Sequence, residues 1–74
     1  MLRDYKQVLL RIAASLDAAA AALDAGDLRR ARFEMIGAEM LCCVETYGTA
    51  DLEDTLLACQ LYMRKVDLKK KIYY

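Results

Sequence analysis

The stretch from residue 35 to residue 44, MIGAEMLCCV, is apolar on almost every side of the helix that it would form. A surface helix of a globular protein normally carries one apolar stripe about 100° wide. Glu39 is the only charged residue in this stretch, so its helix needs cover on more than one side. Two other helices of the same chain can supply part of that cover, and we expect a partner chain to supply the rest.

The chain is short for a domain that must bury such a helix. It has 74 residues, and a domain of this size buries only about 60% of the surface of its unfolded chain. Small domains are commonly stabilised by disulfides, by a metal or by a partner. Hydrophobic residues make up 58% of the chain and it contains no Pro, and its many Ala and Leu residues favour helix. We therefore expect one all-α domain over residues 1–74.

Apolar spacing and turn residues divide the chain into three predicted helices. They cover about residues 2–25, 28–47 and 50–72. Gly26 is the predicted left-handed stop of the first helix, and Asp27 is the predicted N-cap of the second. Gly48 closes the second helix, and Thr49 or Asp51 opens the third. Because short turns make successive helices antiparallel, the prediction is a three-helix antiparallel bundle built from helical hairpins.

The second and third predicted helices have more apolar surface than one contact requires. In the second helix, Ala31 and Met35 lie on one stripe, and Phe33 and Met40 lie on another. We expect one stripe of each helix to face a second chain, which makes the bundle self-associating. The predicted interface residues are Phe33, Ile36, Met40, Cys43, Tyr47, Leu57, Leu61 and Leu68. Gly37 either permits close helix approach at a symmetry axis or is simply tolerated within the helix.

Three cysteines and one glutamate are the candidates for chemistry. Cys42, Cys43 and Cys59 are one ligand short of a structural zinc site, and the chain has no His to complete it or to activate a thiol. We interpret them as small buried apolar residues, with redox sensing or a Cys43–Cys59 bridge as alternatives. Glu39 is either a buried functional carboxylate or a group that reaches the surface or pairs with an Arg of another subunit. No catalytic residue, cofactor or metal is predicted.

Basic residues gather at one end of the predicted bundle although the net charge is zero. Antiparallel packing places the start of the second helix beside the end of the third. The resulting basic patch contains Arg29, Arg30, Arg32, Lys69, Lys70 and Lys71. Arginines in a first helical turn are unfavourable by about 0.3–1 kcal/mol each. The patch is therefore either neutralised locally, by Asp24 and Asp27, or used to dock an acidic protein surface or a phosphate backbone.

Residues 19–38 contain the small residues Ala19, Ala31 and Ala38 on the two sides of a turn at Gly26 and Asp27. This pattern resembles the first helix, turn and second helix of a tetratricopeptide repeat. The resemblance implies a helical-hairpin interaction module.

Together these features predict a small protein-interaction module without enzymatic activity, such as an adaptor, a chaperone-like subunit or an inhibitor of a larger assembly. The first-choice assembly is a homodimer through the second and third helices. One alternative is a small dimeric nucleic-acid-binding regulator that uses the basic patch, and a less favoured one is a helical enzyme with a polar pocket between helices. The longest stretch without charge, residues 55–63, is short of the roughly 20 residues of a membrane span. With no secretory-signal pattern at residues 1–4, we expect a cytoplasmic protein that binds no membrane.

Overall fold

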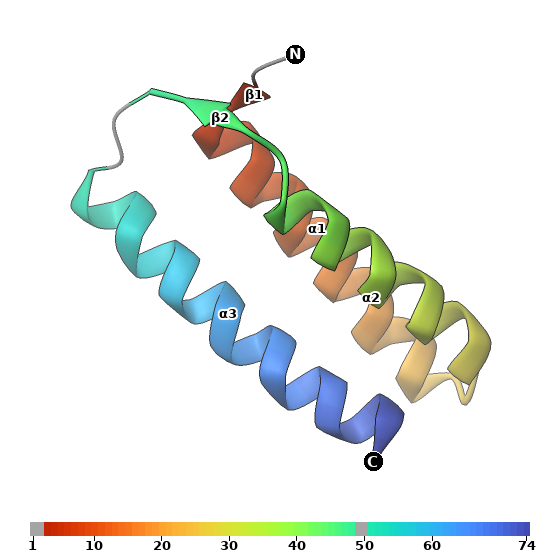
Figure 1. The fold of residues 1–74 in the computed structure, drawn as a ribbon. Helices are drawn as coiled ribbons and strands as arrows, with labels where there is room; N and C mark the ends of the chain where they lie inside the picture. Colours follow the sequence, from red (N-terminus) through yellow and green to blue (C-terminus); the bar gives the residue numbers. More distant parts are fainter. Residues whose placement is uncertain (1–2, 49–50) are drawn as a thin grey trace.

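Three helices form most of the chain in the computed structural model, which describes residues 3–48 and 51–74 (Figure 1). They are α1 (Tyr5–Asp24), α2 (Leu28–Cys42) and α3 (Leu52–Tyr73). Two short strands, β1 (Arg3–Asp4) and β2 (Thr46–Tyr47), pair in parallel. The all-α class is confirmed, and the helices form a compact body of 38 × 25 × 17 Å. The predicted helix starts at residues 2 and 50, the alternative cap Thr49 and the side chain of Tyr47 lie outside what is described.

The turn between α1 and α2 has the geometry that its sequence predicts. Gly26 has a φ of +78°, the left-handed conformation that glycine adopts without steric strain. Its N–H donates to the carbonyl of Leu23 at 3.0 Å, and the N–H of Asp27 donates to the carbonyl of Ala22 at 2.9 Å, the bonds of a Schellman motif. The Asp27 carboxylate then caps α2 by accepting from the N–H of Arg30 at 3.0 Å. The predicted stop and the predicted cap are both confirmed.

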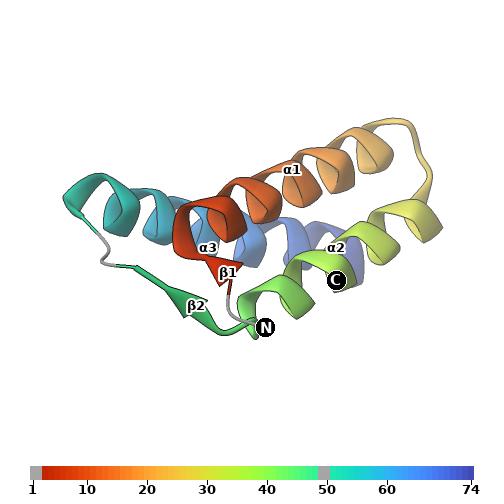
Figure 2. The same ribbon diagram turned by 90° about the horizontal axis from the view of Figure 1, so that it is seen from above.

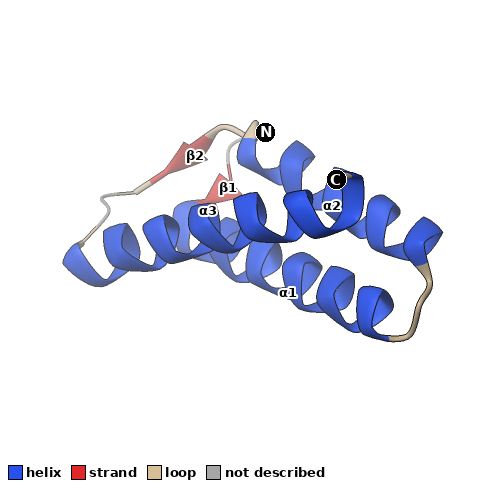
Figure 3. Cartoon of the chain, turned by 90° about the horizontal axis from the view of Figure 1, so that it is seen from below, coloured by secondary structure: helices blue, strands red, loops and turns tan. Residues whose placement is uncertain are grey.

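α2 is shorter than predicted, because it ends at Cys42 and not near residue 47. The residues that follow include Val, Thr and Tyr, which favour extended backbone over helix. The N–H of Arg3 donates to the carbonyl of Glu45 at 3.1 Å, and β1 then pairs with β2. Gly48, with a φ of +102°, follows β2 and does not close α2. Figures 2 and 3 show both strands near the end of the molecule opposite the α1–α2 turn.

The hydrophobic core lies between α1 and the inner sides of the other two helices. Leu16 of α1 and Met35 of α2 are the largest fully buried side chains. Around them, Ala19, Ala31 and Ala38 are also fully buried, and small residues of this kind let two helices pack closely. α3 lies mainly against α1 and touches α2 less. α2 and α3 therefore each keep one side turned away from the core.

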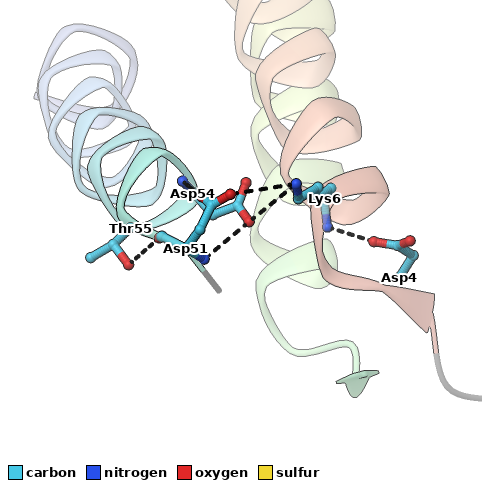
Figure 4. A network of polar contacts seen from close by, with 5 residues as sticks. All are labelled: Asp4, Lys6, Asp51, Asp54 and Thr55. Atoms are coloured by element: carbon cyan, nitrogen blue, oxygen red, sulfur yellow. Dashed lines mark hydrogen bonds and ion pairs between the residues drawn. The ribbon is translucent and has the colours of Figure 1, made fainter. Parts of the chain in front are cut away.

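α3 begins at a reciprocal cap that a lysine joins to α1 (Figure 4). The Asp51 carboxylate accepts from the N–H of Asp54 at 2.8 Å, and the Asp54 carboxylate accepts from the N–H of Asp51 at 3.4 Å. Nζ of Lys6 lies 3.6 Å from Asp51 and 3.9 Å from Asp54. The bond from the Asp54 backbone is the main cause that lowers the pKa of Asp51; desolvation opposes it, and the charge of Lys6 supports it.

Replacing Asp51 with Ala should lower the urea midpoint of unfolding at pH 7, because the start of α3 loses its cap. Asp51→Asn keeps a capping oxygen but cannot titrate. The folded pKa of Asp51 lies below the ordinary value of 3.8, so the stabilisation is present above that pH and is lost as the pH falls through the folded pKa. Urea denaturation at pH 7 and from about pH 4 to pH 2 measures both effects. An Asp51→Asn variant with the same acid dependence as the wild type would contradict this assignment.

Candidate interaction surface

The side of α2 that is turned away from the core carries an unpaired apolar stripe. Phe33, Ile36 and Met40 are 68%, 52% and 68% exposed. Their spacing of three and four residues places them on one side of the helix, opposite the buried Met35. We call Phe33, Ile36, Gly37 and Met40 the α2 face. Three of the predicted interface residues therefore lie together on an open surface of the isolated chain.

Gly37 lies in the middle of the α2 face, and no described residue packs where its side chain would be. A Cβ added at this position would meet nothing within 4 Å among the described residues. A glycine inside a helix is unfavourable by about 1 kcal/mol relative to alanine. Nothing in the described part of the fold requires that loss. Gly37 and Met40 line an open hollow to which Arg3, Arg11 and Ser15 also contribute.

α3 has a second exposed apolar stripe, which we call the α3 face. It consists of Leu52, Leu56, Cys59 and Met63, all of them exposed. Their spacing again places them on one side of the helix. The interface predicted from the sequence lies on the other apolar stripe of the same helix, with Leu57, Leu61 and Leu68.

That assignment is corrected by the burial of α3. Leu61 and Leu68 are only 5% and 8% exposed and belong to the chain's own core, and Leu57 is packed against that core. Leu61 and Leu68 are therefore covered within the chain itself, and Leu57 is partly covered. Of the other predicted interface residues, Cys43 is exposed just after α2. The side chain of Tyr47 lies outside the described part of the chain.

An apolar groove of about 270 Å³ lies between α1, the end of α2 and α3. Val8, Ile12, Leu41, Val44, Leu61 and Tyr62 contribute to its lining. Thr46 and Lys65 are the polar side chains in the lining besides Tyr hydroxyls and the thiol of Cys42. Within residues 3–48 and 51–74, no three His, Cys, Asp or Glu side chains are grouped as metal ligands would be.

The basic patch is partly engaged within the chain. The guanidinium of Arg30 lies 2.9 Å from Glu34, and that of Arg32 lies 5.6 Å from the ring centre of Tyr73. The second contact joins the start of α2 to the end of α3, so the patch residues from both helices lie at one end of the molecule, as Figure 1 shows for the two helix ends. Among the described residues, no carboxylate lies within salt-bridge distance of Arg29, Lys70 or Lys71.

Glu39 is paired inside its own chain. Its Oε1 lies 2.7 Å from Nζ of Lys69 on α3. The oxygen is shielded from solvent and has no hydrogen-bond partner among the described residues, so we describe the contact as an ion pair. Interaction with the Glu39 carboxylate raises the pKa of Lys69. Glu39 is therefore not an isolated buried carboxylate, because it pairs with Lys69 of the same chain.

All three cysteines are free and exposed, which corrects the interpretation that they are buried. Cys42 ends α2, Cys43 follows it, and Cys59 lies on the α3 face. The predicted alternative of a Cys43–Cys59 bridge is not present. The cysteines lie at positions that continue the apolar spacing of the sequence but do not pack in the core.

Comparison of the chain with protein-family models, with curated proteins and with solved structures found no match. Among the described helices, none has the length and apolar character needed to cross a membrane.

Proposed function

We propose that this protein is a small interaction module that binds partner chains through the α2 face and the α3 face, and that it self-associates, most simply as a homodimer. The observation that carries this proposal is the exposure of Phe33, Ile36 and Met40 on a helix whose opposite side is fully buried. In this proposal the three helices act as an antiparallel bundle, and its core holds the two faces in fixed positions.

The total exposed surface supports the same proposal. The chain exposes 5354 Å², whereas a folded monomer of 8.4 kDa exposes about 4,600 Å². The excess of about 750 Å² is close to the roughly 800 Å² that each partner contributes to a standard protein interface. An adaptor, a chaperone-like subunit or an inhibitor of a larger assembly would use such a surface without catalysis.

The remaining free cations of the basic patch would steer an acidic protein surface toward the module. A nucleic-acid partner has less support, because Arg30, Arg32 and Lys69 already have partners in the chain. Three reduced and exposed thiols are compatible with the reducing cytoplasm, the location that we propose.

Sedimentation equilibrium at micromolar concentration tests self-association directly. We expect a mass above 8.4 kDa that changes little between about 50 and 200 mM salt, because apolar contacts respond weakly to salt while phosphate contacts respond steeply. A strict monomer over this range would refute self-association. Association only with added nucleic acid, lost at the higher salt, would favour the regulator instead.

Replacing Met40 with Asp should dissociate the protein without unfolding it. From the sequence alone, this change is expected either to dissociate or to unfold the protein. Met40 is 68% exposed in the isolated chain, so the new carboxylate is solvated in the monomer. In an interface the same charge would be buried, and we expect self-association about 100-fold weaker or worse. Leu10→Asp is the matched control, since Leu10 is an exposed apolar residue of α1. If Met40→Asp kept both its mass and its helical signal, the α2 face would not be the interface.

A further inference from the structure

We infer that the occupant of the α2 face is a second copy of this chain, whose α2 runs antiparallel to the first across a two-fold axis beside Ile36 and Gly37. This inference rests on the proposed self-association and adds to it the face, the direction and the register. Two observations on α2 support it: the open space above Gly37, and charges that are reversed relative to the helix dipole.

The two-fold axis pairs residues that are equally far from the point between Ile36 and Gly37. Phe33 then faces the partner's Met40, and Ile36 faces the partner's Gly37. The Ile36 side chain would enter the open space above that glycine, since a Cβ there meets nothing within 4 Å among the described residues. Helices that pair in this way fill the gaps of one with the side chains of the other. The register therefore gives Gly37 a packing role.

The same register brings opposite charges together at both ends of the pair. Arg29 lies in the first turn of α2, where the helix dipole disfavours a cation, and α2 has no acid in that turn. Glu45 is exposed shortly after the other end of α2. Antiparallel pairing places Arg29 close to the negative end of the partner's helix and to the partner's Glu45. A second α2 thus supplies the compensation that the described part of the chain does not give Arg29.

The charges in the first and last turns of α3 need no compensation of this kind. Glu53 and Asp54 are in its first turn, and Lys70 and Lys71 are in its last turn, so its charges already agree with its dipole. We therefore assign the second copy to the α2 face and leave the α3 face for a different partner.

Gly37→Ala distinguishes the effect of residue 37 on helix stability from its effect on self-association. In the monomeric Met40→Asp background, the alanine should raise the urea midpoint, because it favours helix and meets no neighbour. In the wild-type background it should weaken self-association about tenfold, since its methyl group occupies the space that the partner's Ile36 needs. A Gly37→Ala variant that associates as tightly as the wild type, or more tightly, would overturn the register.

A charge exchange tests the direction. Arg29→Glu and Glu45→Arg should each weaken self-association about tenfold at low salt, because each homodimer then holds two like-charge contacts. Arg29→Glu also improves the α2 dipole, so its monomer stays folded. In an equimolar mixture of the two variants, the heterodimer has both contacts with opposite charges, and sedimentation equilibrium should show association close to that of the wild type. A mixture no tighter than the single variants would overturn the antiparallel pairing.

Met63→Asp, on the α3 face, distinguishes this inference from the proposed function. It should leave the dimer intact. If Met63→Asp dissociates the protein and Met40→Asp does not, the second copy occupies the α3 face and the inference is wrong while self-association stands. A wild-type protein that stays monomeric throughout would refute the proposed function itself.

Discussion

Leu16→Ala is expected to remove about 2–5 kcal/mol of stability, the range for truncating a fully buried leucine. Leu16 is one of the two largest side chains with no exposed surface. A domain of 74 residues has a total stability of about 4–11 kcal/mol, so this one substitution removes a large share of it. The surrounding helices cannot close the cavity fully, because α1 is already held at both ends by the α1–α2 turn and by the β1–β2 pair.

The measurement is urea and thermal denaturation followed by circular dichroism, at one fixed protein concentration because self-association adds to the apparent stability. The melting temperature should fall by about 10 °C or more. Leu10→Ala is the matched control, since Leu10 belongs to the same helix and is exposed; its effect should stay within about 0.5 kcal/mol. Equal losses in the two variants would show that the core is not centred on Leu16.

Ala31→Leu should destabilise the protein by about 3 kcal/mol, through excess volume and not through a cavity. Ala31 is fully buried, one residue beyond the arginine whose N–H bonds to the Asp27 cap. This part of α2 cannot move away from α1, because the Schellman turn is only a few residues distant. The larger side chain must therefore push the two helices apart or adopt a strained rotamer.

Ala14→Leu makes the same chemical change at an exposed position of α1 and should be almost neutral. Denaturation of the two variants under identical conditions isolates the effect of burial. If Ala31→Leu were as stable as Ala14→Leu, α1 and α2 would not be in the close contact that their alanines indicate.

The parts of the fold that could be predicted are those formed by interactions between residues close together in the sequence. Gly26 and Asp27 form the stop and the cap because each acts on groups a few positions away. The end of α2 could not be found in this way, since apolar spacing continues through Cys43 and on toward Tyr47. Val44 and Thr46 beyond the helix favour extended backbone, but the pairing of β1 with β2 is a contact between distant segments that apolar spacing does not reveal.

The candidate surface shows the same limit. The sequence contains two apolar stripes on α3, and only packing against α1 decides that Leu61 and Leu68 face inward. One weak signal was present: the apolar residues of the inward stripe as far as Ile72 are all aliphatic, whereas the outward stripe includes Cys59 and Met63. On α2, the exposure of Phe33, Ile36 and Met40 agrees with the sequence analysis, and their role in an interface stays a prediction.

The small thickness of the molecule, 17 Å, has a thermodynamic consequence. A helix with its side chains is about 10–12 Å wide, so little of the protein is more than one side chain from water. Unfolding then exposes less new apolar area than it does in a rounder domain, and both the heat-capacity change and the denaturant m-value should be low for a chain of this length. The isolated monomer should melt over a wide temperature interval, and any partner that covers its open faces should make that transition steeper as well as raise its midpoint.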